Sequence, residues 1–98
     1  MIDITPTGTG DPMTFRVAVR TDGSESRHDV KLSRADYDRF TGGRRSPEQC
    51  IDAAFRFLLD REPKEAILAT FDVAVISRYF PEFERELAGY MSSPRGSS

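Results

Sequence analysis

The chain has 98 residues, and its 14 Lys and Arg against 16 Asp and Glu give a formal net charge of -2. This balance provides no global positive field that would attract nucleic acid or anionic lipid. Hydrophobic residues make up 38% of the chain and charged residues 31%, which is typical of one ordinary soluble domain with a single small core. No apolar run approaches the ~20 residues that span a bilayer, and the N-terminus lacks the features of a signal peptide. We therefore expect a cytoplasmic protein that does not enter a membrane.

Both ends of the chain are predicted to lie outside the folded domain. Residues 1–12 contain glycine, proline and threonine and too few apolar side chains to offset the entropy of ordering. We expect them to form a flexible tail, with docking of its first few residues on the domain as the alternative. Residues 92–98, S-S-P-R-G-S-S, have the composition of a disordered tail. A single globular domain over residues 13–91 remains.

Two strands joined by a tight turn are predicted at the start of this domain. Residues 13–20, M-T-F-R-V-A-V-R, alternate between apolar and polar positions. Residues 26–32 show the same period of two, and Asp22-Gly23 between the runs is a strong turn signal. The sequence therefore predicts an antiparallel hairpin with one apolar face and one charged face.

The stretch 46–63 predicts a central helix over residues 47–61. Ser46 is suited to cap the first N–H groups, Pro47 suits the first helical position, and Gln49 completes a capping box. Pro63 ends the helix. Apolar side chains cover roughly 240° of its circumference, so the helix needs neighbours on several sides.

Four further helices are predicted. The stretch 72–79 is ambiguous, because its β-branched residues favour a strand whereas Asp72 is a good N-cap. We predict a helix there. The predicted ranges are 33–41, 63–71, 72–79 and 81–90.

These elements predict an α+β fold in which an N-terminal antiparallel β-hairpin packs on a small bundle of four to five helices. The core is expected to combine the apolar face of the hairpin with the apolar sides of the helices. Its predicted members are Phe15, Val17, Val30, Leu32, Ile51, Ala54, Phe55, Leu58, Ile67, Val75, Ile76 and Phe83.

Catalytic chemistry has little support in the sequence. Cys50 and His28 form the only possible Cys–His pair, and both lie on apolar faces of their elements, where a structural role is the simpler interpretation. A single cysteine excludes an internal disulfide, and one histidine among dispersed carboxylates gives no metal-binding spacing. We expect no enzymatic activity, no cofactor and no metal.

The join G-G-R-R-S-P at the start of the central helix is a candidate anion site. Arg44, Arg45 and Ser46 would present positive charge and helix N–H groups to a phosphate or carboxylate. The alternative is a capped helix with two solvated arginines, since a helix-turn-helix join requires similar residues.

The segment Y-F-P-E-F is a candidate partner surface. Tyr79, Phe80 and Phe83 crowd around a proline, and they form either a corner of the core or an aromatic patch that faces a protein partner.

Residues 26–59 resemble the ribbon-helix-helix family of DNA-binding proteins in their order of strand, short helix, glycine turn and longer helix. The helix E-Q-C-I-D-A-A-F-R-F-L-L is similar to that family's pattern E-x-x-I-x-x-A-[L/F]-x-x-[L/Y]-L. The resemblance implies a dimer whose paired strands enter the major groove. Base-facing residues would be Arg27, Asp29 and Lys31, and phosphate-binding residues Arg44, Arg45 and Ser46. Pairing of strand 26–32 within the chain would leave no such intermolecular ribbon.

Residues 41–83 resemble a group of small bacterial proteins without an established activity. The resemblance lies in T-G-G-R-R-S-P-E-Q, F-R-F-L-L-D-R-E-P-K-E-A-I-L and F-D-V-A-V-I-S-R-Y-F-P-E-F, and it implies a compact free-standing domain. We expect a non-enzymatic interaction module that binds an unknown protein partner or a second copy of itself. A dimeric DNA-binding transcriptional regulator is the alternative.

Overall fold

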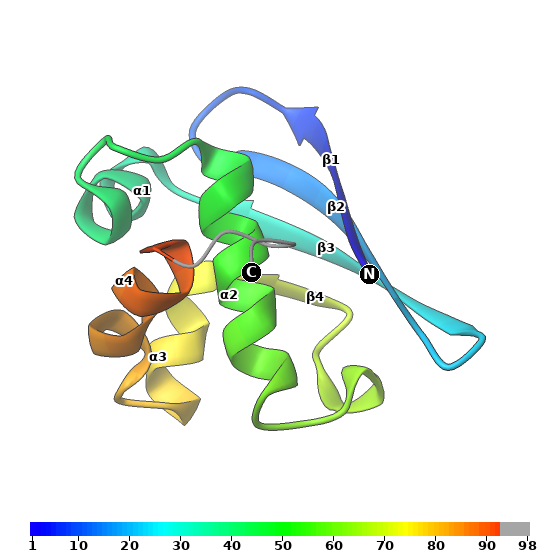
Figure 1. Cartoon of the computed structure of the whole chain (residues 1–98). Helices are drawn as coiled ribbons and strands as arrows, with labels where there is room; N and C mark the ends of the chain where they lie inside the picture. The colour runs from blue at the N-terminus through cyan, green and yellow to red at the C-terminus, as the bar shows by residue number, and fades with distance from the viewer. Residues whose placement is uncertain (93–98) are drawn as a thin grey trace.

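The structure is a computed structural model that describes residues 1–92. It has a mixed α+β fold in which helices pack on one face of a four-stranded sheet (Figure 1). The elements in chain order are β1 (Ile2–Gly8), β2 (Met13–Thr21), β3 (Ser24–Leu32), α1 (Arg34–Thr41), α2 (Pro47–Leu59), the 3-10 turn η1 (Lys64–Ala66), β4 (Thr70–Asp72), the 3-10 turn η2 (Val73–Val75), α3 (Ile76–Tyr79) and α4 (Phe83–Ser92).

The predicted hairpin forms the middle of the sheet, whose strand order is β1-β2-β3-β4. Strands β2 and β3 pair in antiparallel fashion from Met13 opposite Leu32 to Thr21 opposite Ser24. The turn contains Asp22 and Gly23, with positive φ angles of 53° and 76°. Positive φ at both central positions matches the twist of a two-residue hairpin, so the turn and the hairpin are confirmed.

The prediction of a flexible tail at residues 1–12 is wrong for Ile2–Gly8, which form the edge strand β1. Ile2 lies opposite Val19 in an antiparallel ladder, and the Met1 amine donates to the Arg20 carbonyl at 2.7 Å. Proline is tolerated in β1 because an edge strand leaves half of its N–H groups without a ladder partner. At the other end, Ser92 closes α4, and the remainder of the predicted tail lies outside the described residues.

The predicted helix at 63–71 is also wrong. Only η1 is helical there, and the chain then extends into β4, which pairs in parallel with β3. The Asp29 N–H donates to the Ala69 carbonyl at 2.7 Å. Pro63 starts one turn, but β3 then supplies the hydrogen bonds that a helix would have supplied internally.

Helical structure follows β4, as predicted for 72–79. The Asp72 side chain accepts a hydrogen bond from the Ala74 N–H at 2.9 Å and caps η2, which runs directly into α3. Val75 is half-buried rather than a core residue, and Val73 is fully buried in its place. A 3-10 turn has three residues per turn, so Val73 and Ile76 share its inner face.

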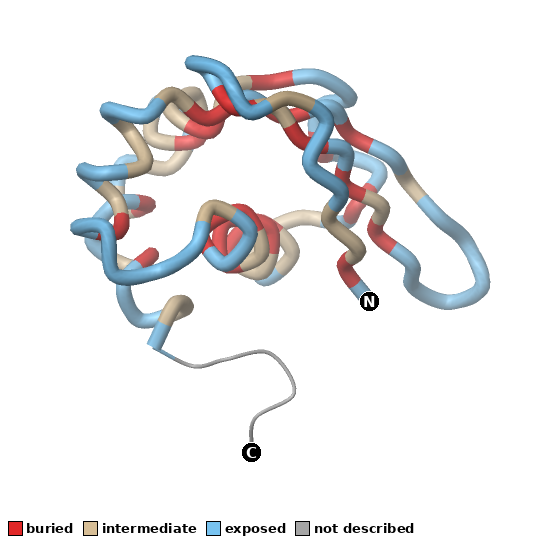
Figure 2. Tube along the Cα trace, turned by 90° about the horizontal axis from the view of Figure 1, so that it is seen from above, coloured by how far each residue is buried: buried red, intermediate tan, exposed pale blue. Residues whose placement is uncertain are grey.

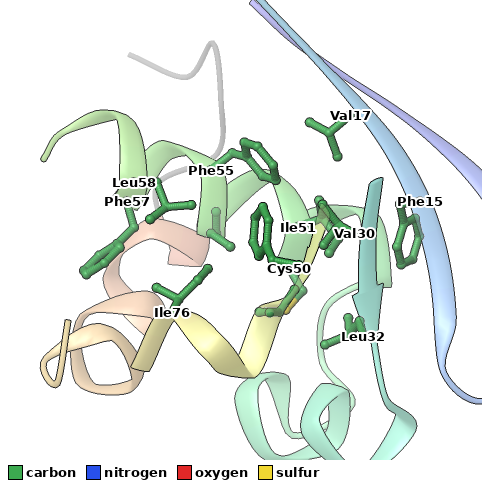
Figure 3. Close-up of a cluster of buried hydrophobic side chains, with 14 of the residues drawn as sticks. Phe15, Val17, Val30, Leu32, Cys50, Ile51, Phe55, Phe57, Leu58 and Ile76 are labelled. Atoms are coloured by element: carbon green, nitrogen blue, oxygen red, sulfur yellow. The ribbon is translucent and has the colours of Figure 1, made fainter. Parts of the chain in front are cut away.

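Helix α2 is the central helix that the sequence predicts. The Gln49 N–H donates to Ser46 Oγ at 3.1 Å and the Ser46 N–H donates to Gln49 Oε1 at 2.8 Å, which completes the capping box. Ile51 and Phe55 face the strands, whereas Phe57 lies on the side turned away from them (Figure 3). Seen from above, α2 runs between the sheet and the remaining helices (Figure 2).

The core therefore has two parts on opposite sides of α2. One lies against the inner face of the sheet, and the other lies against α4 and the α3–α4 corner, where Phe57 and Phe83 meet with ring centroids 5.1 Å apart. All predicted core residues except Val75 are buried. No helix within residues 1–92 has the length and apolar character needed to cross a membrane.

Candidate functional site: an apolar groove beside α3

An apolar groove of about 410 Å³ opens between the C-terminal end of α2, the segment that leads into β4, and α3. Ligand pockets in proteins commonly enclose roughly 300–1,000 Å³, so the groove can hold several side chains or a small apolar molecule. Nine of its ten lining residues are uncharged. They are Leu58, Ala66, Ile67, Leu68, Phe71, Val75, Ile76, Tyr79 and Phe80, and the tenth is Glu62.

Two walls of the groove are helical. Leu58 lies in the last turn of α2, and Glu62 follows one turn later because its N–H donates to the Leu58 carbonyl at 2.9 Å. The facing wall carries Ile76, Tyr79 and Phe80, whose spacing of three and four residues places them on one side of α3. The Phe80 N–H donates to the Ile76 carbonyl at 2.8 Å and closes this short helix.

The third wall is held in place by His28 of β3. This side chain is only 3% exposed, and its Nδ1 lies 2.7 Å from the Leu68 carbonyl oxygen. A carbonyl accepts and cannot donate, so Nδ1 carries the proton. Nε2 lies 2.8 Å from Ser26 Oγ. His28 therefore ties the groove segment to the sheet across 40 positions of sequence.

The rim of the groove exposes two large apolar side chains. Leu68 is 50% exposed and Tyr79 is 68% exposed. Apart from Met1, they are the large hydrophobic residues that are exposed within residues 1–92. Their concentration at one hollow distinguishes this surface from the scattered single apolar residues of an ordinary exterior.

The predicted aromatic patch is divided between this groove and the core. Tyr79 and Phe80 line the groove, as a partner surface would require. Phe83 does not belong to any surface, because it is 0% exposed and packs edge-on against Phe40 and Phe57. Phe83 begins α4, which turns this side chain back toward α2, a direction that the segment's composition does not reveal.

Glu62 is the one charged residue in the groove lining. It is half-buried, and its carboxylate has no ion-pair or hydrogen-bond partner within residues 1–92. Neighbouring carboxylates are engaged: Glu65 accepts from Lys64 at 2.8 Å, and Glu82 accepts from Arg61 at 3.2 Å. The groove therefore combines apolar walls with a carboxylate that is available to a bound cation.

The predicted anion site is largely occupied by the protein itself. Pro47 has no N–H, the Gln49 N–H donates to Ser46 Oγ, and the Cys50 N–H donates to the Ser46 carbonyl at 3.1 Å. Of the first four helical residues, only Glu48 is left with a donor, and its own carboxylate opposes an anion. The flanking Arg44 and Arg45 are exposed. This arrangement matches the alternative of a capped helix with solvated arginines.

The residues that the DNA-binding resemblance assigns to base contacts lie on the solvent face of the sheet, where Arg27, Asp29 and Lys31 are exposed. Arg27 pairs with Glu25 at 2.6 Å, and Asp29 pairs with Arg16 at 3.4 Å. Hydrogen bonds from Arg20 and Arg27 hold the pKa of the Glu25 carboxyl below its ordinary value. These ion pairs offset most of the positive charge that this face could offer to phosphates.

Strand β3 has no free edge for a dimer mate. It pairs with β2 on one side and with β4 on the other. The intermolecular ribbon that the ribbon-helix-helix resemblance implies would need one of these edges.

Cys50 and His28 take structural positions. Cys50 is fully buried, and burial raises the pKa of its thiol to about 12, so a thiolate nucleophile is not formed near neutral pH. Within residues 1–92, no group of three or more His, Cys, Asp or Glu side chains is arranged to hold a metal ion.

Comparison of the chain with protein-family models, curated proteins and solved structures gave no match.

Proposed function

We propose that this protein is a non-enzymatic interaction module that binds apolar side chains of a protein partner in the groove beside α3. The observation that carries the proposal is the exposure of Leu68 and Tyr79 at the rim of a hollow whose walls are otherwise apolar. Exposed apolar surface of this kind, bordered by polar residues, marks interaction sites in monomeric proteins.

The energetics favour a partner that covers this surface. Removing apolar area from water stabilises a complex by about 25 cal/mol per Å², and a few well-packed anchors dominate most interfaces, with tyrosine among the most frequent. Tyr79 offers a large ring at low entropic cost, because its side chain has few rotatable bonds. Leu58, Ile67 and Ile76 supply the walls against which a partner's anchors would pack.

Rigid support of the groove agrees with a binding role. His28 anchors the Leu68 backbone to β3, and the lining residues Ile67, Phe71 and Ile76 are buried in the core. A preformed site loses little conformational entropy when a ligand binds, which raises affinity.

The experiment is a selection of random peptides against the purified full chain, followed by affinity measurements with groove variants. We expect Leu68→Asp and Tyr79→Asp each to weaken binding of the selected peptides by at least about tenfold, since each places a charge in an apolar contact. Ala35→Asp is the matched control, because it adds the same charge at an exposed position of α1 outside the groove.

Far-UV circular dichroism and thermal melting of all three variants establish that they fold. Leu68 and Tyr79 are exposed, so these substitutions leave the core intact. The proposal would be overturned if the selection yielded no binding peptide, or if neither groove substitution changed the affinity of the selected peptides.

A further inference from the structure

We infer that the natural occupant of the groove is an amphipathic helix of a partner protein that carries a lysine or arginine at the border of its apolar face, placed to contact Glu62. This inference rests on the proposed function and specifies the chemistry of the partner. Three observations support it. Two walls of the groove are helical, the Glu62 carboxylate is unpaired within residues 1–92, and a second copy of the chain would bring a second Glu62 carboxylate to the same interface.

The walls favour a helix as the bound element. The groove lies between the C-terminal end of α2 and α3, so a third helix can lay its side chains between those of the two walls, as in ordinary helix packing. Recognition of this type uses apolar anchors at positions i, i+3 or i+4, and i+7 of the bound helix.

An extended peptide would find few backbone groups to pair with in this region. Addition of a strand requires a free sheet edge, and β4 has only the three residues Thr70–Asp72. The Asp72 side chain is already engaged as the cap of η2. Backbone hydrogen bonds along such a short edge would contribute little.

The carboxylate of Glu62 specifies a basic partner. A bound helix would take this half-buried group further out of water, and burial of a charge without a counter-charge is costly. A lysine or arginine on the partner removes that cost and adds a charge-assisted hydrogen bond. The exposed Arg78, which precedes Tyr79 on α3, also has no ion-pair partner within residues 1–92, so an acidic residue elsewhere on the helix would be tolerated.

A second copy of this chain fits the groove less well. A symmetric dimer centred on the groove would bring both Glu62 carboxylates into one interface, where like charges repel. A stable interface also buries about 800 Å² per partner, whereas Leu68 and Tyr79 are the large apolar side chains exposed beside the groove within residues 1–92.

The test uses synthetic peptides of about 15 residues that are stapled as helices, with leucines at i, i+3, i+4 and i+7 and a single lysine moved along the border of the apolar face. The tightest peptide is then compared with its lysine-to-glutamate counterpart. Both are titrated against the wild-type chain, Glu62→Gln and Glu62→Lys.

We expect the lysine peptide to bind Glu62→Gln about tenfold more weakly than wild type, the size of effect of a charged hydrogen bond at a partly buried site. The glutamate peptide should gain about tenfold on Glu62→Lys. Glu65→Gln is the matched control, because it removes an equal charge three residues away that already pairs with Lys64, and it should leave both affinities unchanged.

Failure of this inference can be told apart from failure of the proposed function. Peptides that are weakened by Leu68→Asp but respond alike to Glu62→Gln and Glu65→Gln would refute the basic contact and leave the groove as a binding site. Equal affinity of an unstapled, proline-containing peptide would refute the helical occupant. A dimer in sedimentation that Leu68→Asp dissociates would assign the groove to a second copy and overturn the inference.

Discussion

Replacement of Phe57 by alanine should be among the most damaging single substitutions in this protein. Phe57 is 0% exposed and its ring meets those of Phe80, Phe83 and Tyr90 edge-on, with centroid separations of 5.8, 5.1 and 5.8 Å. The guanidinium of Arg61 lies 3.6 Å from the ring centroid. The single side chain therefore joins α2 to the α3–α4 corner.

The expected cost follows from these contacts. A buried Phe→Ala change destabilises a protein by about 3–5 kcal/mol, and edge-on aromatic pairs and a stacked cation place Phe57 near the upper end of this range. We expect about 4–5 kcal/mol. A domain of this size has a total stability of about 5–15 kcal/mol. Because each kcal/mol lowers the melting temperature of a small domain by about 4–8 °C, the melting temperature should fall by roughly 15–40 °C.

Urea unfolding followed by circular dichroism measures this cost directly. Leu59→Ala is the matched control, because Leu59 lies in the same helix but is only half-buried, and it should cost about 1–2 kcal/mol. Phe57→Leu keeps most of the volume and should fall between the two. If Phe57→Ala destabilised the protein no more than Leu59→Ala, Phe57 would not be the side chain that joins α2 to the α3–α4 corner.

Three other predictions test separate features of the molecule. Ser46→Ala and Gln49→Ala should each lower the free energy of unfolding by up to about 1 kcal/mol in urea titrations, because each removes one bond of the capping box. Cys50 should resist thiol reagents at about pH 8 and react after unfolding in urea, since its pKa is raised to about 12 and it is fully buried. Hydrogen bonds from its own backbone and from Arg61 lower the pKa of Glu82. Its stabilising effect is therefore complete above the ordinary carboxyl pKa and is lost as the pH falls through the lowered value, so Glu82→Gln should flatten the acid side of the stability profile.

Elements with local signals could be predicted from the sequence. Ser46, Pro47 and Gln49 predict where helix α2 begins, and its apolar arc predicts which side is buried. All of these features are confirmed. In the hairpin, Asp22-Gly23 predicts the turn, and the alternation of apolar and polar residues predicts the inner face. In each case the groups that satisfy the backbone lie within a few residues, or directly across a tight turn.

The two outer strands could not be predicted in this way. Strand β1 has only two aliphatic residues, Ile2 and Ile4, and β4 has three residues in total. Their order depends on hydrogen bonds offered by β2 and β3. The composition and periodicity of a segment indicate which of its side chains are buried. They do not indicate which sheet edge lies close enough to pair with it.

Some residues of the candidate site could be predicted from the sequence, and others could not. Tyr79 and Phe80 were identifiable as a cluster of aromatic residues, and they line the groove. Leu68, Glu62 and His28 had no local signal for this role. Leu68 fell within a predicted helix, and Glu62 stands in the charged run D-R-E-P-K-E.

Taken alone, the sequence determined the mixed fold class, the central position of α2, the hairpin and nearly all of the core, because capping, turn chemistry and hydrophobic period act over a few residues. Only the tertiary structure decided the edge strands and the groove. A sheet edge is completed by a strand that is distant in the chain, as when β4 reaches β3. The groove likewise combines the ends of two helices with a segment that His28, 40 residues away in the chain, anchors to the sheet.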